Sequence, residues 1–438
     1  MSAWAAAAAA ASVSGVALVS RRLAPTPVTG PMLLVAAGLA CGPVGLDLLD
    51  ISRDAEAVQL LLEVTLVAVL FTDAAGVRWS VLRRDDALPL RLLSLGLPLT
   101  IGAGAVGAWL LLPGFTVWEL ALVGVVLAPT DAALGQAAIA DRRVPASVRQ
   151  GLNVESGLND GIALPFFVVL LAAATGDTEG AGAGEVFLLA LGVSTVVGVA
   201  VGRLGAGMLA WCTAHEWVSP EWRRVPALAF AALGYAVTVS LGGSGFITAW
   251  VAGLVFGAVW RRRVPPAAAA TEGPESVVGL SEELGNLLAS VSFFVFGAVL
   301  LGPALSTVTW RTASYAVLSL TLVRMVPVAA ALTGSRFRWP TVVYVGWFGP
   351  RGLASIVFAL LMLHDGPPSA DVLVDVIALT VGLSVVLHGA TASWAARTYA
   401  AWHAAAAAAE PDLREGPAEP LRDTPVDRAV GTGIISGG

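Results

Sequence analysis

Apolar residues are grouped along the chain in long runs, which short polar connections separate. Thirteen such runs are visible, at about residues 3–20, 30–48, 57–76, 88–112, 117–140, 149–174, 185–212, 224–241, 245–261, 281–302, 310–333, 340–364 and 370–395. Runs of about 20 apolar residues match the thickness of a bilayer core. They lack the two-residue alternation of strands, and only helices and closed barrels satisfy their backbone in lipid. The pattern therefore predicts an all-α polytopic membrane protein with about 13 transmembrane helices.

The composition agrees with a membrane protein. Of 438 residues, 57% are hydrophobic and only 13% are charged, whereas soluble domains carry about a quarter charged residues. All 25 basic residues are arginine, which excludes any chemistry that needs a lysine amine. The two cysteines, Cys41 and Cys212, lie in apolar runs and suggest neither a disulfide framework nor a metal site. The net charge of −6 indicates no nucleic-acid partner.

Arginine is distributed unevenly between the two sides of the predicted helices. Connections after odd-numbered runs contain pairs such as Arg21 and Arg22, Arg142 and Arg143, and Arg336 and Arg338. Connections after even-numbered runs are mainly acidic, so the positive-inside rule places the N-terminus outside and the C-terminus in the cytoplasm. We expect a multi-pass protein of a bacterial plasma (inner) membrane, with a transmembrane domain at 1–398 and a short disordered cytoplasmic tail at 399–438.

The sixth run contains ionisable residues at a depth where charge is costly. Glu155 and Asn159 are four residues apart, as are Ser156 and Asp160, so all four side chains share one broad face of a helix. Two carboxylates on a lipid-facing stripe would be untenable, and each is therefore a functional hypothesis. The alternative is a buried hydrogen-bonding cluster that only joins helices.

The fifth run is interrupted at its centre by Pro129-Thr130-Asp131. Proline removes a backbone hydrogen bond and disfavours helical geometry just before it. Free carbonyls at this depth are tolerated where they line a cavity, and broken helices with such carbonyls coordinate small cations in many transporters. The alternative is a proline kink at which Asp131 caps the second half-helix, and both interpretations can hold together.

Three further charges lie in or near apolar runs. Asp73, near the end of the third run, is either an acid of a cytoplasmic funnel or an end-of-helix charge. Arg324 lies deep in the eleventh run, and Arg351 follows the helix breaker Pro350 in the twelfth. Because a lone buried charge is the costly state, Glu155 is expected to pair with one of these arginines.

These motifs together resemble the monovalent cation/proton antiporter family, in its sodium/hydrogen exchanger branch of the prokaryotic NhaP type. The resemblance rests on the Glu155–Gly161 segment, the broken helix at Thr130-Asp131 and the Gly349-Pro350-Arg351-Gly352 motif. It implies a secondary transporter and not an enzyme, with no cofactor beyond the transported Na⁺, K⁺ or Li⁺ and H⁺. The implied fold has two inverted repeats, two interrupted crossing helices, a core domain and a dimerisation domain that forms a homodimer.

The resemblance also implies roles for individual residues. Asp160 would be the carboxylate that binds cation and proton, with Asp131, Ser156, Asn159 and the Thr130 backbone as ligands or neighbours. Glu155 would pair with Arg324, and Arg351 would stabilise the interrupted helix or share that pair. The family often reads Thr-Asp-Pro at the break, whereas Pro129 precedes Thr130 here, so the carbonyls that face the ion stay open.

The residues themselves also favour exchange. Removal of Asp160 from water favours its neutral form, so that a proton and a cation compete for one carboxylate, and one-for-one exchange moves no net charge. A proton-coupled carrier of a small organic substrate and a cation channel on the same fold are the alternatives. Trp250 and Trp260 could line an organic site, but aromatic residues at a bilayer interface explain them equally well. An intramembrane aspartic protease would need other sequence contexts around Asp131 and Asp160.

Overall fold

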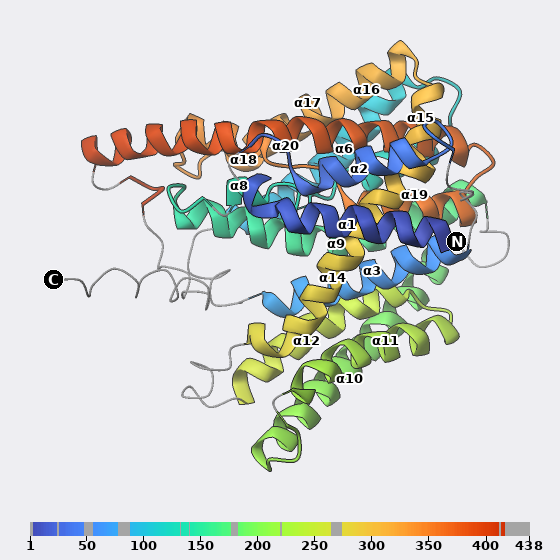
Figure 1. Ribbon diagram of the computed structural model, residues 1–438, viewed down its shortest axis with the longest axis vertical. Coiled ribbons are helices and arrows are strands. Elements are labelled where there is room, and N and C mark those ends of the chain that lie inside the picture. The colour runs from blue at the N-terminus through green and yellow to red at the C-terminus, as the bar shows by residue number, and fades with distance from the viewer. Residues whose placement is uncertain are drawn as a thin grey trace.

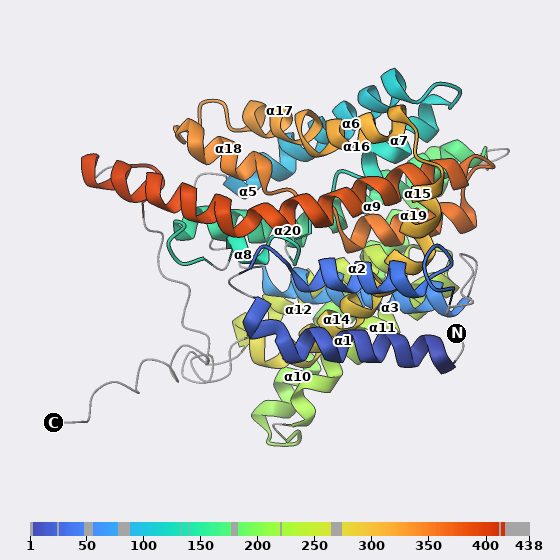
Figure 2. The same ribbon diagram turned by 45° about the horizontal axis from the view of Figure 1, so that its top comes forward.

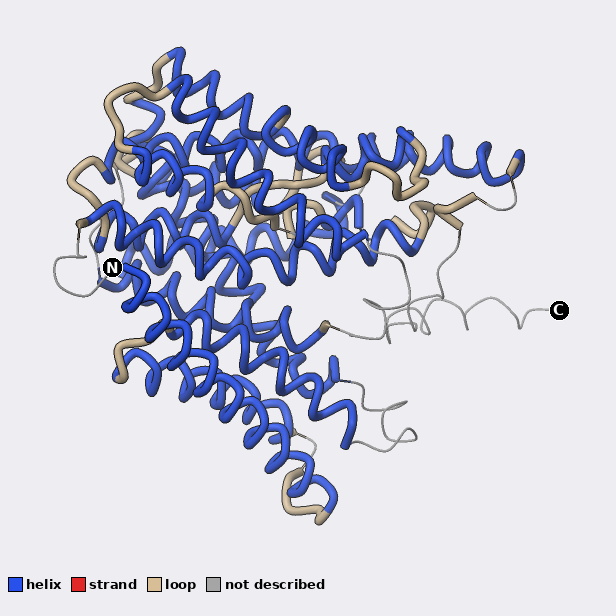
Figure 3. Tube along the Cα trace, turned by 180° about the vertical axis from the view of Figure 1, so that it is seen from behind, coloured by secondary structure: helices blue, strands red, loops and turns tan. Residues whose placement is uncertain are grey.

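The computed structural model describes residues 3–23, 26–47, 56–77, 88–131, 133–139, 141–176, 183–219, 221–263, 274–410 and 413–416. All secondary structure in these residues is helical, which confirms the all-α prediction (Figure 3). Each of the thirteen expected runs contains helix. Eight of the described helices are long and apolar enough to cross a bilayer, so the count of thirteen spans stays a prediction.

One set of helices, which we call the scaffold group, packs together. Its members are α1 (Ala3–Leu23), α2 (Gly30–Cys41), α3 (Glu56–Gly76), α10 (Ala183–Ala214), α11 (Val225–Ser240), α12 (Gly245–Arg263) and α14 (Pro274–Phe296). A Cβ atom at Gly253 of α12 would lie 2.3 Å from the carbonyl oxygen of Phe71, and one at Gly257 would lie 2.2 Å from that of Ala75. The two glycines therefore let α12 lie directly against the backbone of α3.

A second set, the core group, lies beside the scaffold group (Figures 1 and 2). Its members are α5 (Leu88–Arg91), η1 (Leu92–Gly96), α6 (Leu97–Leu111), α7 (Val117–Val126), α8 (Gln136–Ile139), α9 (Ala146–Thr175), α16 (Trp310–Leu320), α17 (Leu322–Ala331), α18 (Trp339–Trp347), α19 (Leu353–Asp365) and α20 (Ala370–Ala409). Three short elements complete the described helices: η2 (Trp222–Arg224), η3 (Gly297–Leu301) and α15 (Gly302–Ser306). The two sets meet where α9 and α19 contact α3, and where α9 contacts α12.

Two helices of the core group are interrupted where the sequence predicts it. α7 ends at Val126, and Pro129 and Thr130 are not helical, before α8 begins. α18 ends at Trp347, and α19 begins only after Pro350. Proline cannot donate a backbone hydrogen bond, so each half-helix presents free polar groups at its end.

One end of the bundle is rich in arginine, and we call it the arginine-rich face. α12 ends there at Arg261–Arg263, and Arg261 donates hydrogen bonds to the carbonyl oxygens of Ala75 and Val77 at the end of α3. α9 begins directly after Arg142 and Arg143 and runs away from this face. The prediction that this face is cytoplasmic stays a prediction.

The C-terminal helix is longer than the expected thirteenth run. α20 continues to Ala409 and includes the first eleven residues of the expected disordered tail, 399–409. Six consecutive alanines, Ala404 to Ala409, explain the extension because alanine has the highest helix propensity. Residues 413–416 contact the start of α18, where buried Glu415 accepts hydrogen bonds from the Arg338 backbone and the Thr341 hydroxyl. Residues 417–438 lie outside the described residues.

Candidate functional site

The two interrupted helices meet at their breaks. The Asp131 backbone N–H donates to the carbonyl oxygen of Pro350 at 2.8 Å. The Asp131 carboxylate accepts from the backbone N–H groups of Leu353 at 3.0 Å and Ala133 at 2.8 Å. Its negative charge therefore lies at the N-terminal end of α19, where a helix carries partial positive charge. The predicted break is confirmed, and Asp131 caps a half-helix of the other interrupted helix rather than of its own.

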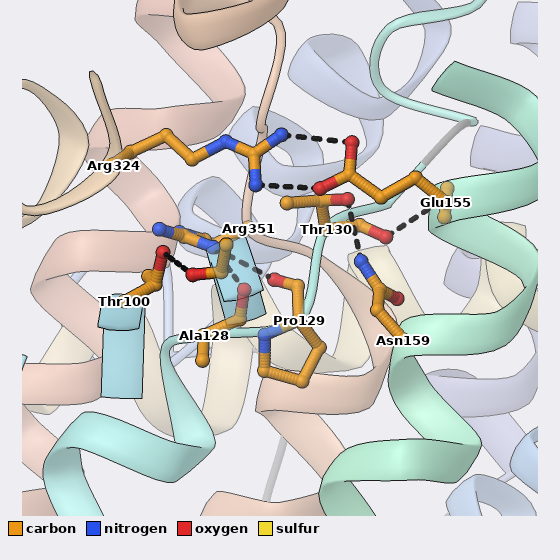
Figure 4. Close-up of polar contacts among 10 residues, drawn as sticks. Thr100, Ala128, Pro129, Thr130, Glu155, Asn159, Arg324 and Arg351 are labelled. Carbon is orange, nitrogen blue, oxygen red and sulfur yellow. Dashed lines mark hydrogen bonds and ion pairs between the residues drawn. The ribbon is translucent and has the colours of Figure 1, made fainter. Parts of the chain in front are cut away.

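A positive charge occupies the complementary position. Arg351 is fully buried, and its Nη1 donates to the carbonyl oxygens of Ala128 and Pro129, just beyond the C-terminal end of α7 (Figure 4). Its Nε and Nη2 have no hydrogen-bond partner among the described residues. Carbonyl groups at a helix C-terminus carry partial negative charge, so the guanidinium stabilises this end. Each interrupted helix thus supplies the charged side chain that stabilises a half-helix end of the other.

The α9 helix holds the first break in place through two side chains. Ser156 Oγ donates to the Thr130 carbonyl oxygen at 2.6 Å, and Asn159 Nδ2 donates to Thr130 Oγ1 at 2.7 Å. All three residues are buried. The shared helix face predicted for these residues therefore points at the break, and the Thr130 carbonyl, whose direction the sequence left open, points at α9 (Figure 4).

Glu155, on the same face of α9, forms a buried ion pair with Arg324. Arg324 Nη1 lies 2.6 Å from Glu155 Oε1 and Nη2 lies 2.9 Å from Oε2, and the side chains are 2% and 3% exposed. Parallel hydrogen bonds of this kind are the strongest geometry available to arginine and a carboxylate. The expected pairing of Glu155 with Arg324 is therefore present. Arg351 does not share this pair, since its guanidinium contacts backbone carbonyl groups.

Two glycines of the Gly349–Gly352 motif make room for these charges. A Cβ atom at Gly349 would lie 2.4 Å from Arg324 Nε, and one at Gly352 would lie 2.0 Å from Asp131 Oδ2. No side chain fits at either position without displacing a charged group. Glycine is therefore required at 349 by the Arg324–Glu155 ion pair and at 352 by the Asp131 cap.

Asp160 lies one residue beyond this network. Its side chain is partly exposed, but Oδ1 is buried and has no hydrogen-bond partner among the described residues, as is also true of Asn159 Oδ1. Asp131 and Asp73 both act on Asp160 electrostatically. The carboxylate oxygen of Asp160 can accept a proton, and both oxygens can coordinate a hard cation, for which oxygen is the preferred ligand.

Asp73 lies between Asp160 and the arginine-rich face. It is exposed, and a Cβ atom at Gly157 would lie 3.3 Å from Asp73 Cβ, which places Asp73 beside α9 one turn before Asp160. Of the two interpretations left open by the sequence, this position favours an acid at the entrance to the site. Sequence reasoning missed Glu282 of α14, which acts on Asp73 electrostatically. Its only signal was an acidic pair near the start of the tenth run.

The comparisons with known proteins agree with this architecture. The family model for the transmembrane region of sodium/hydrogen exchangers matches residues 8–398. The chain belongs to the sodium/hydrogen exchanger family. Its fold is similar to that of the sodium proton antiporter MjNhaP1 from Methanocaldococcus jannaschii at pH 8, with a TM-score of 0.73 and 22% identity over 90% of this chain and 98% of that one. The antiporter fold predicted from the sequence is thereby confirmed.

Curated members of the family give the same assignment. The K⁺/H⁺ antiporter NhaP2 of Shewanella sp. strain MR-4 is 26% identical over 384 residues, which cover 84% of this chain and 62% of that protein. The Na⁺/H⁺ antiporter ApNhaP of Aphanothece halophytica is 28% identical over 228 residues, or 52% of this chain and 42% of that protein. The chain thus spans about 62% of the length of the NhaP2 relatives that it matches.

Proposed function

We propose that this protein is a secondary antiporter that exchanges a monovalent cation for H⁺ at Asp160. The observation that carries the proposal is the buried Asp160 Oδ1, which has no hydrogen-bond partner in the described part of the chain. An uncompensated carboxylate at membrane depth is costly. Binding of either a proton or a cation removes this cost, so the two species compete for one group.

The surrounding charges support exchange of one proton for one cation. Glu155 is neutralised by Arg324, and Asp131 is stabilised by the N-terminal end of α19. Asn159, beside Asp160, carries no charge and donates to Thr130. Where the two interrupted helices meet, Asp160 is then the carboxylate whose charge depends on whether a proton or a cation is bound. One H⁺ exchanged for one monovalent cation at this group moves no net charge.

Cation and proton transport are coupled only if the core group moves between its two access states when Asp160 is neutralised by one of the two ions. A bare carboxylate and a bare cation each carry a large desolvation penalty in the bilayer. The transported ion is proposed to be Na⁺ or K⁺, with Li⁺ as a third candidate. Antiporters of Na⁺ and of K⁺ both occur among the relatives, and the oxygen ligands at the site suit all three ions. A homodimer in the plasma membrane, with the N-terminus outside, is part of the proposal.

The proposal is tested by dequenching of an internal pH dye in proteoliposomes with an imposed pH gradient. Na⁺, K⁺ and Li⁺ are added in turn, with and without valinomycin. Dequenching by at least one cation, without need of an ionophore, is the expected result for the native protein. Asp160→Asn is expected to abolish it. Asp365→Asn is the matched control, since Asp365 is 60% exposed at the end of α19 and is expected to leave exchange unchanged.

Other outcomes would identify the alternatives. Cation flux that needs no opposing proton gradient would indicate a channel on the same fold. No response to any of the three cations would favour a proton-coupled carrier of a small organic substrate. Exchange that persists in Asp160→Asn would contradict the assignment of the site even though exchange itself was shown.

A further inference from the structure

The scaffold group places one aromatic side chain directly on the candidate ion site. Trp250 belongs to α12, and a Cβ atom at Gly161 of α9 would lie 2.2 Å from its Cδ1 and Nε1. The indole edge therefore touches the backbone of the residue that follows Asp160. Trp250 also packs against a small apolar cluster formed by Val77, Leu93 and Leu158, so it bridges the two groups of helices.

The indole N–H makes no hydrogen bond to the described residues. Trp250 Nε1 is buried and has no hydrogen-bond partner among the residues that the structure describes. Tryptophan at a bilayer interface, the interpretation that the sequence allowed, would have this group in contact with water or lipid headgroups. A buried indole donor without an acceptor costs free energy, so its retention beside the orphan oxygen of Asp160 calls for a functional reason.

The register of the helices shows on which side of Asp160 the indole lies. α3 and α12 run in parallel toward the arginine-rich face, because Gly253 lies against Phe71 and Gly257 lies against Ala75. Trp250 is therefore farther from that face than Asp73, by about 7 Å at 1.5 Å per residue. The α9 helix runs the opposite way and passes Asp73 at Gly157 before it reaches Trp250 at Gly161.

We propose that Trp250 is the gate that closes the pathway between Asp160 and the membrane face opposite the arginine-rich one. This proposal rests on the proposed exchange function. In the described state, Asp160 lies between exposed Asp73 on one side and the indole on the other, so ions reach it from the arginine-rich face. When the core group moves against the scaffold group, Gly161 leaves Trp250 and the far side opens. Glycine is required at 161 because any Cβ atom would prevent closure.

The first test uses reciprocal changes in size. Gly161→Ala is expected to reduce exchange in proteoliposomes by at least about tenfold, since the added methyl group overpacks the contact with the indole. Trp250→Leu in the same chain is smaller than tryptophan, so it makes room for the methyl group and still leaves an apolar cover, and the double variant is expected to recover at least half of the native rate. Trp250→Phe, which keeps an aromatic ring but removes the N–H group, separates closure from hydrogen bonding. Each variant is first checked for a native elution profile and thermal unfolding.

A second readout does not depend on exchange. In a chain with Cys41 and Cys212 replaced by serine, Ile162→Cys reports access to the residue after Gly161. A membrane-impermeant thiol reagent applied from the far face is expected to label it about tenfold faster when Trp250 is alanine, because the cover over this turn is removed. If the native protein shows no exchange but labelling rises in the Trp250→Ala chain, the proposed exchange function is wrong, whereas the proposal that Trp250 covers the site is supported.

Three results would overturn the gate. Gly161→Ala could exchange as fast as the native protein, which would show that the contact is not needed for closure. Folded Gly161→Ala could stay inactive when Trp250→Leu is added, which would assign the defect to α9 alone. Labelling at position 162 could be the same with and without the indole, which would show that Trp250 covers nothing.

Discussion

Replacement of Glu155 by glutamine tests whether the buried ion pair holds the core group together. The change keeps the size and shape of the side chain but removes its negative charge. In the native protein, both oxygens of Glu155 accept hydrogen bonds from Arg324, and both side chains are at most 3% exposed. Glutamine offers one acceptor and turns an N–H donor toward the guanidinium. Arg324 is then a buried charge without a counter-ion.

The expected loss follows from this geometry. A hydrogen bond to a charged group contributes about 1.5–3 kcal/mol, and removal of one partner from a buried pair costs about 3–5 kcal/mol. Because glutamine retains one of the two bonds, we expect Glu155→Gln to lower the free energy of unfolding by about 3 kcal/mol. The double variant Glu155→Leu with Arg324→Met removes both charges, and is expected to lie within about 2 kcal/mol of the native protein.

Reversible unfolding by SDS in mixed micelles, followed by the fluorescence of the 14 tryptophans, measures these differences. Glu410→Gln is the matched control, because the Arg338–Glu410 pair is 54% exposed on each side and is expected to contribute at most about 1 kcal/mol. If Glu155→Gln costs no more than this control, the pair does not stabilise the fold. Strict additivity of Glu155→Leu and Arg324→Met in the double variant would also contradict the reasoning, since residues in contact should couple.

Three further substitutions test the contacts around the helix breaks and the C-terminal segment. Ser156→Ala removes the hydrogen bond to the Thr130 carbonyl and is expected to cost about 1 kcal/mol in the same SDS titration; no measurable loss would contradict the contact. Arg351→Met leaves two carbonyl groups at the end of α7 unpaired and is expected to cost about 2–3 kcal/mol and slow exchange; full activity would show that the charge is dispensable. Glu415→Gln weakens the contact with Thr341 and is expected to speed amide hydrogen exchange at 413–416 about tenfold by mass spectrometry; unchanged protection would place the anchor elsewhere.

Local rules were sufficient to predict the elements of the site. The i,i+4 spacing of Glu155 and Asn159 predicts a common helix face, and the structure turns that face toward the break. Proline chemistry predicts the interruptions near Pro129 and Pro350. These inferences depend only on residues that are near one another in the sequence, and they are confirmed.

The partners of the charges depend on long-range packing and could not be predicted from the residues alone. Arg324 and Arg351 are both buried arginines near helix breakers, and nothing in their local sequence says which one reaches Glu155. The choice is made by the Gly349 backbone, which leaves space for the guanidinium of Arg324. The same limit applied to Trp250. An indole near a helix end resembles an interface residue until the helix packed against it is known.

The tail illustrates a different limit. A shift in composition near Tyr399 predicted disorder from that residue, but helix propensity carries α20 through Ala409. Buried Glu415 then satisfies the N-terminal end of α18, a position that favours negative charge. Composition averages over such single contacts and therefore does not detect them.

The charges around the two helix breaks support the proposal that one carboxylate controls exchange. Asp131 and Arg351 each stabilise the end of a half-helix, and Glu155 is neutralised by Arg324, so each of these charges has a partner within the protein. The Asp160 Oδ1 atom has none among the described residues. Under the proposed function, a cation or a proton is the partner that it lacks, and the energy of moving the core group then depends on which of them Asp160 carries. A site in which all five charges had protein partners would have no unpaired carboxylate oxygen to offer to a cation.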